Sequence, residues 1–301
     1  MKKYTVSDLV MENSVIERIG DLGSDSRVYS EVKTPTARIC RLNVSTESDS
    51  KKYGCGVGSY VTVYTRELWR MGVEETEELA REVAEELRAM ISRCCPHKAW
   101  GELSVLVVGI GNAKMTPDSI GPHTVDKLTV TRHLRGVAPT VFEKLGRCSV
   151  SALNCGVMGD TGMRTVEIIK GVADNTAPDI VLAVDSLCAK SYDRLAATVQ
   201  LSDRGIVPGA GIGQAMSAVD RETVGVPVIA IGVPTVVSAA TLVEESVRKS
   251  GYKRIAEGLA EVLERTRDLF VAPKECDLIA TRVSDLLARA IDSALCVIKE
   301  E

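Results

Sequence analysis

Three short, continuous apolar runs constrain the fold most strongly: LSVLVVG (103–109), DIVLAVD (179–185) and VPVIAIG (226–232). Runs of this length without polar alternation are typical of strands that are buried on both faces, as in parallel sheets covered by helices. The intervening segments are long enough for helices, and such crossover connections are right-handed. We therefore predict an α/β fold with a doubly wound, mainly parallel sheet flanked by helices.

Weaker patterns surround these runs. Alternating and β-branched residues predict further strands at 37–44, 59–65, 149–153 and 196–201. Amphipathic segments predict helices at 74–94, 254–270 and 276–298. The segments between the predicted strands predict three more helices, at 119–134, from 161 to about 171, and from after Pro234 to about 249. Residues 1–35 are polar and irregular. The expected single domain has a β-rich N-terminal extension (9–72), an α/β core (73–250) and C-terminal helices (251–301).

Composition excludes several classes of protein. The net charge is −4 and aromatic residues make up 4%, which disfavours a nucleic-acid surface built from basic and stacking side chains. The apolar runs are strand-length and the N-terminus is polar, so we expect a cytoplasmic chain that binds no membrane. The nine cysteines are scattered without a C-x-x-C pair, and there are three histidines. We expect reduced cysteines, no metal and no cofactor.

In a doubly wound sheet, ligands bind beyond the carboxyl ends of the strands. Two acids lie in loops expected there: Asp118 in the segment 109–122 and Asp185 at the start of the segment 185–194; a third such loop is 232–237. Each acid has a structural alternative as a helix N-cap. Together, two carboxyl groups that share a proton act as general base and general acid. The same pair is also suited to holding a divalent cation, and spacing does not decide between these roles.

Other motifs carry weaker hypotheses. Gly109 and Gly111 follow a strand, but Lys114 replaces the third glycine of a dinucleotide-binding fingerprint, which favours a tight turn. Ser186 and Cys188 are nucleophile types without an adjacent base, unless His123 or His133 approaches in space. The glycine-rich segment 205–213 is interpreted as either a mobile connection or a substrate-binding flap.

Taken together, several segments resemble the germination protease family of spore-forming bacteria. The resemblance is carried by GIGNAKMTPDSIGP (109–122), VTRHL (130–134), GVMGDTGMRTVEIIKG (156–171), PDIVLAVDSLCAKSYDR (178–194), TVQLSDRGIVPGAGIG (198–213) and VGVPVIAIGVPTVV (224–237), with GVGSYVTV (56–63) and APKECD (272–277). It spans nearly the whole chain. It implies a fold similar to the hydrogenase maturation endopeptidases and an atypical aspartic endopeptidase.

The resemblance also implies roles for individual residues. The acids proposed as catalytic in the family correspond to Asp118 and Asp185. Residues expected to bind substrate or support the loops are Asn112, Thr116, Asp203, Gly209 and Gly211. A prosegment is expected at residues 1–8, with the cut near Asp8 and Leu9. Family members are homotetrameric zymogens that degrade small acid-soluble DNA-binding proteins in the spore core, cleaving after an acidic residue, usually Glu, and before an apolar one.

The chain departs from the family pattern at five positions while keeping both acids: Asp160, Arg164, Arg204, Val207 and Ala210. Ser186 and Cys188 also replace small alanines beside the second acid. We predict a self-processing aspartic endopeptidase that acts on small acid-soluble spore proteins. The alternatives are a metal-dependent maturation-type peptidase and a diverged, non-catalytic paralogue.

Overall fold

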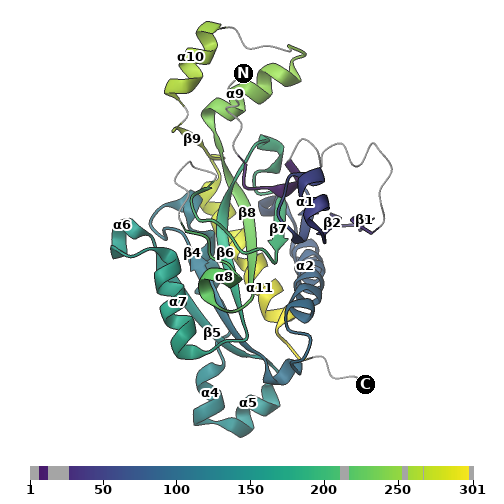
Figure 1. Cartoon of the computed structure of the whole chain (residues 1–301), viewed down its shortest axis with the longest axis vertical. Coiled ribbons are helices and arrows are strands. Elements are labelled where there is room, and N and C mark those ends of the chain that lie inside the picture. The colour runs from purple at the N-terminus through teal and green to yellow at the C-terminus, as the bar shows by residue number, and fades with distance from the viewer. Residues whose placement is uncertain (1–6, 13–26, 211–216, 253–256, 267, 298–301) are drawn as a thin grey trace.

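A computed structural model describes residues 7–12, 27–210, 217–252, 257–266 and 268–297. One sheet forms the centre of the molecule, in the strand order β1-β2-β3-β7-β8-β6-β4-β5, with β9 paired to β8 (Figure 1). The strands are β1 Tyr29–Lys33, β2 Arg38–Val44, β3 Gly58–Tyr64, β4 Ser104–Ile110, β5 Ser149–Gly156, β6 Ile180–Ala189, β7 Thr198–Ser202, β8 Val228–Ser238 and β9 Phe270–Val271. Strands β5, β4, β6 and β8 pair in parallel, and the remaining pairs are antiparallel. The predicted α/β class is confirmed.

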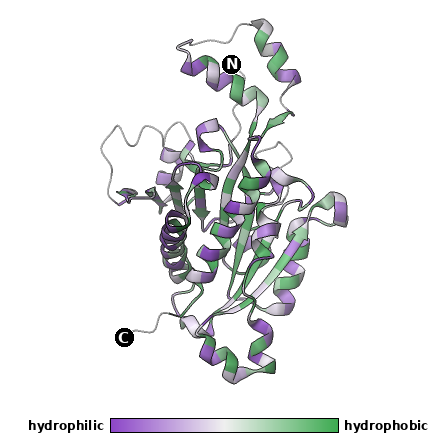
Figure 2. Cartoon of the chain, turned by 180° about the vertical axis from the view of Figure 1, so that it is seen from behind, coloured by the Kyte–Doolittle hydropathy of each residue, from purple (hydrophilic) through white to green (hydrophobic). Residues whose placement is uncertain are grey.

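Helices cover both faces of this sheet. The α-helices are α1 Glu47–Tyr53, α2 Val73–Cys94, α3 Ile120–Val125, α4 Arg132–Val137, α5 Pro139–Leu145, α6 Met158–Thr161, α7 Thr165–Thr176, α8 Arg221–Val224, α9 Ala239–Lys249, α10 Glu257–Arg265 and α11 Cys276–Ala294. Single 3-10 turns lie at η1 Val10–Glu12, η3 Leu68–Arg70, η4 Trp100–Glu102, η5 Thr116–Asp118 and η6 Tyr192–Arg194. Apolar residues gather in the strands and on the sides of the helices that face them (Figure 2).

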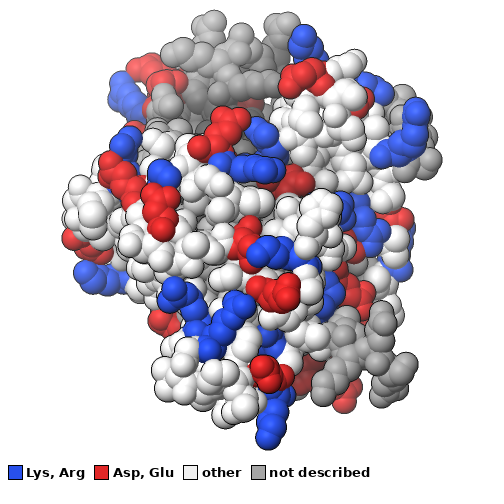
Figure 3. Space-filling model, turned by 60° about the horizontal axis from the view of Figure 1, so that its bottom comes forward, with Lys and Arg blue, Asp and Glu red and all other residues white. Residues whose placement is uncertain are grey.

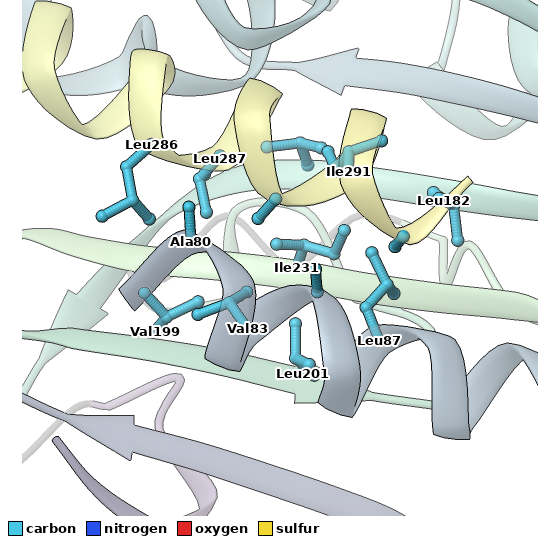
Figure 4. Packing of buried hydrophobic residues seen from close by; sticks show 14 of the residues in the cluster. Ala80, Val83, Leu87, Leu182, Val199, Leu201, Ile231, Leu286, Leu287 and Ile291 are labelled. Atoms are coloured by element: carbon cyan, nitrogen blue, oxygen red, sulfur yellow. The ribbon is translucent and has the colours of Figure 1, made fainter. Parts of the chain in front are cut away.

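The larger core lies between the sheet and helices α2, α3 and α11. Val83 and Leu87 of α2 meet Leu287 and Ile291 of α11 over the strands, as Figure 4 shows. On the central strands, every second residue faces this core, and the residues between them face α7 and α8. This two-sided burial is the physical reason that the central strands are uniformly apolar.

The structure corrects several predicted boundaries. Strands β6 and β8 continue beyond residues 185 and 232, through segments expected to be loops. Residues 119–134 do not form one helix, because α3 ends at Val125 and α4 begins at Arg132. The N-terminal region expected to be irregular contains β1. In the described residues, no helix combines the length and the apolarity needed to cross a bilayer.

Candidate active site

Asp118 is positioned by a tight turn after β4. Gly111 has φ +116°, and a Cβ added there would lie 2.2 Å from the main-chain oxygen of Asp118, so only glycine allows this approach. The main-chain N–H of Asn112 donates to Asp118 Oδ2 at 2.8 Å. Ser119, not Asp118, precedes α3 as the N-cap, and no side chain caps that helix. The helix-cap interpretation of Asp118 is therefore wrong.

Two further contacts hold the turn η5 that carries this acid. The hydroxyl of Thr235, on β8, donates to the main-chain oxygen of Pro117 at 2.6 Å. Thr116 donates to Asp277 Oδ1, at the start of α11, at 3.0 Å. The turn is thereby fixed to the sheet on one side and to a long helix on the other.

Asp185 lies within β6 and is 6% exposed. The main-chain N–H of Ser186 donates to its Oδ1 at 2.8 Å. Because β6 continues to Ala189, no helix starts at Ser186, and the cap interpretation of Asp185 is also wrong. The acid projects from the same face of β6 as Ala183 and Leu187, beyond the part of that face covered by α7 and α8.

Both acids line one cavity of about 420 Å³. Burial raises the pKa of Asp118 above its usual value, although the Asn112 N–H lowers it in part. Burial, and then the nearby Asp118 carboxyl group, raise the pKa of Asp185 well above its usual value. Two acids with unequal environments in one cavity are suited to divide general acid and general base roles between them.

The segment Ser7–Glu12 lies along this cavity. The Asp8 N–H donates to the main-chain oxygen of Cys188 at 2.9 Å, and the Cys188 N–H donates to Asp8 Oδ2 at 2.9 Å. Leu9 is 3% exposed and packs against Leu187 and Val237. The expected cleavage position, Asp8–Leu9, therefore lies beside the acid pair.

Glu12 anchors the far end of the segment. Its carboxylate accepts the main-chain N–H groups of Lys190 at 2.6 Å and Ser191 at 2.9 Å, and it contacts the Ser7 hydroxyl. Burial raises the pKa of Glu12, and these donors, together with the charge of Arg194, lower it in part. Both ends of the segment are thus bonded to the β6 strand and the loop that follows it.

The residues expected to bind substrate or support the loops do not all lie at the cavity. Gly209 lines the cavity, and Gly211 lies outside the described residues. The side chain of Asn112 accepts the Lys114 N–H at 2.9 Å, within the turn. Asp203 accepts the Ser59 N–H at 2.8 Å and so connects β7 to β3, away from the acids. These side-chain bonds of Asn112 and Asp203, like that of Thr116, support loops.

The residues considered for other chemistries lie in different parts of the molecule. Ser186 and Cys188 line the cavity, but His133 lines a separate hollow with Lys98 and Asp179, at the opposite ends of the strands. All nine cysteines are free, and four of them are buried. Among the described residues, no group of three or more His, Cys, Asp or Glu side chains is arranged to hold a metal ion.

The positions that depart from the family pattern fall into two groups. Val207 lines the cavity and is 39% exposed, and Ala210 lines a smaller adjoining hollow of about 220 Å³. By contrast, Asp160 pairs with Lys114 at 3.4 Å and Arg164 pairs with Glu167 at 2.7 Å on the surface. Arg204 belongs with the first group, because it lines the same smaller hollow as Ala210 and packs over Gly58.

Sequence reasoning missed two polar residues near the site. Thr235 fixes the turn that carries Asp118, and Gln200, on β7, bonds to the N-terminal segment. Thr235 is visible in the sequence as a polar residue within an apolar run, and Gln200 as one of three alternating polar residues of β7. Both signals are weak, because such residues are common in sheets.

Comparisons with known proteins give matches over most of the chain. The sequence model of the family described as Germination protease matches residues 8–252. The chain is 37% identical over 280 residues to a germination protease of Caldanaerobacter subterraneus subsp. tengcongensis, covering 86% of this chain and 84% of that protein. It is 36% identical over 291 residues to one of Clostridium acetobutylicum, covering 88% of each. It is 40% identical over 254 residues to one of Bacillus mycoides, covering 82% of this chain and 67% of that protein.

Proposed function

Because this chain belongs to the germination protease family and is therefore a peptidase of spore germination, we propose that Asp118 and Asp185 form its catalytic pair. The observation that carries the proposal is their shared cavity, in which burial raises the pKa of both acids. The pair would hydrolyse a peptide bond by an aspartic mechanism without a covalent intermediate.

The unequal environments support an assignment of roles. Asp185 is the more deeply buried, and the carboxyl group of Asp118 further disfavours its ionisation, so Asp185 would hold the proton. Asp118 would be ionised and would take a proton from a water molecule as the water oxygen attacks the peptide carbonyl carbon. Asp185 would then donate its proton to the departing amide nitrogen as the C–N bond breaks.

We further propose that the substrates are small acid-soluble DNA-binding spore proteins, cut after Glu in the spore core. The position of Asp8–Leu9 beside the acids supports an acidic residue before the cut and an apolar one after it. Acidic and basic side chains are interspersed on the face in Figure 3, so that face offers no uniformly basic surface to DNA itself. The homotetramer stays a prediction from the resemblance.

We also propose self-processing, which the same arrangement supports. The N-terminal segment occupies the space beside the acid pair that a substrate peptide would need. The chain would therefore be a zymogen until the bond near Asp8 and Leu9 is cut.

The test is cleavage of a purified small acid-soluble spore protein, read by mass spectrometry, with Asp118→Asn and Asp185→Asn as variants. We expect each variant to lose at least about 10³-fold in kcat, because neither can complete the proton exchange. Cuts should follow Glu and should survive a chelator. Loss of activity with chelator would instead favour the metal-dependent peptidase, and full activity in either variant would exclude the pair.

A further inference from the structure

Resting on the proposed function, we infer that the Gln200 side-chain amide is the peptide clamp of this site, holding a bound chain by its main-chain atoms and donating to the carbonyl group of the bond to be cut. Gln200 Oε1 accepts the Val10 N–H at 2.8 Å, and Gln200 Nε2 donates to the main-chain oxygen of Asp8 at 3.2 Å. One planar amide thus bonds to the main chain on both sides of Leu9.

The burial of Gln200 makes this bonding informative. The residue is 8% exposed in the middle strands of the sheet, where an unpaired amide is costly. Within the described part of the chain, its side chain bonds only to the N-terminal segment. Cleavage between Asp8 and Leu9 detaches Asp8, so Nε2 is left with a donor that another peptide carbonyl group at the same place satisfies. A substrate main chain bound there would also offer an N–H to Oε1 in place of the Val10 N–H.

Sheet register places this amide, which lines the smaller adjoining hollow, in line with Asp185. Gln200 pairs with Gly232, and Gly232 pairs with Asp185, so the three residues form one row across β7, β8 and β6. Paired residues point to the same face, and two strand spacings separate the outer residues by about 10 Å. Gly232 has no side chain between them, and Leu187 lies over it, since a Cβ added at Gly232 would meet Leu187 Cδ1 at 2.4 Å.

The bound segment fits this row. Asp8 is bonded to Cys188 of β6 on one side, and its carbonyl oxygen is bonded to Gln200 of β7 on the other. Leu9 packs on Leu187 between the two strands. The Nε2 donor is therefore directed at the oxygen that gains negative charge when water attacks the carbonyl carbon of Asp8.

The experiment pairs an enzyme variant with a modified substrate. The probe is the peptide YTVSDLVMENSV, the sequence of residues 4–15, and its partner is the same peptide N-methylated at the valine after leucine, which removes the N–H that Oε1 accepts. With wild-type enzyme, N-methylation should lower kcat/KM at least tenfold. Gln200→Met should lower it at least tenfold for the plain peptide, with a loss in kcat as well as a rise in KM.

The decisive result is the coupling between the two changes. In Gln200→Met, N-methylation should cost less than threefold, because the acceptor it disrupts is already absent. If N-methylation lowers kcat/KM by the same factor in Gln200→Met as in wild type, the two changes act independently and the clamp is overturned. An N-methyl effect below twofold on wild type would overturn it as well, whether or not the variant folds. The matched control is Thr62→Val: Thr62 pairs with Gln200 on the next strand, and its buried hydroxyl has no partner among the described residues.

A second readout does not depend on activity. In the full chain carrying Asp185→Asn, which keeps the segment uncut, hydrogen exchange at the Val10 N–H should accelerate at least tenfold on adding Gln200→Met and stay unchanged on adding Thr62→Val. If no peptide is cleaved by wild type, the proposed function fails, while this exchange result still supports or contradicts the clamp.

Discussion

Asp185 carries a carboxyl group whose ionisation the fold opposes. Its pKa is raised in the folded chain, so the folded state binds its proton more tightly than the unfolded state does. Below the usual carboxyl pKa, this proton makes its full contribution to the free energy of unfolding. That contribution is lost as pH rises through the pKa that Asp185 has in the folded chain. At neutral pH, wild type therefore carries a cost that an amide at this position would not have.

The prediction is that Asp185→Asn is more stable than wild type at pH 7, because the amide has no ionisation for the fold to oppose. Asparagine keeps an oxygen to accept the Ser186 N–H. The gain should shrink toward zero near pH 4, as measured by urea unfolding at both pH values. Asp174→Asn, on the exposed side of α7, is the control with no pH-dependent gain expected. A gain equal at both pH values would show that ionisation of the buried Asp185 carboxyl group is not its cause.

At the scale of elements, the turn η5 depends on a bond that comes from another strand. Thr235→Val removes the donor to the Pro117 oxygen at nearly constant volume. Leaving that oxygen unpaired should cost about 1–3 kcal/mol. We expect kcat to fall about tenfold, because Asp118 is then held less firmly, and Thr235→Ser should restore most of it.

Thr198→Val is the matched control for this change. Thr198 is also a buried threonine of the sheet, on β7, but its hydroxyl has no hydrogen-bond partner among the described residues. Its replacement should alter kcat less than twofold. Equal effects of the two valine variants would show that the Thr235 bond does not position the acid.

At the scale of the whole molecule, the segment Ser7–Glu12 lies along the cavity of the two acids, and we propose that it covers the site. Leu9→Asp places a charge in the apolar cluster with Leu187 and Val237 and should release the segment. Exchange of the Lys190 and Ser191 N–H groups, which are bonded to Glu12, should accelerate at least tenfold. Cleavage of an added peptide should rise several-fold because the cavity is open.

The control for this release is Val137→Asp, at a position on α4 that is 83% exposed. Added charge there should change neither the exchange at Lys190 and Ser191 nor the peptide cleavage. Unchanged exchange in Leu9→Asp would mean that the hydrogen bonds of Asp8 and Glu12 hold the segment without the leucine.

The sequence by itself determined the central strands, the long helices α2 and α11, and the two acids as candidates, because burial on both faces and helical periodicity leave local patterns. Its errors came where tertiary contacts override such patterns: β6 and β8 continue past Asp185 and Gly232 because they pair with each other for several more residues. Only the tertiary structure decided that Gln200 and Asp185 lie in one row, and that Asp8 and Leu9 lie beside the acids. The contacts of Asp8 with Cys188 and Gln200 join distant parts of the chain, and strand register, which no local pattern encodes, creates the row.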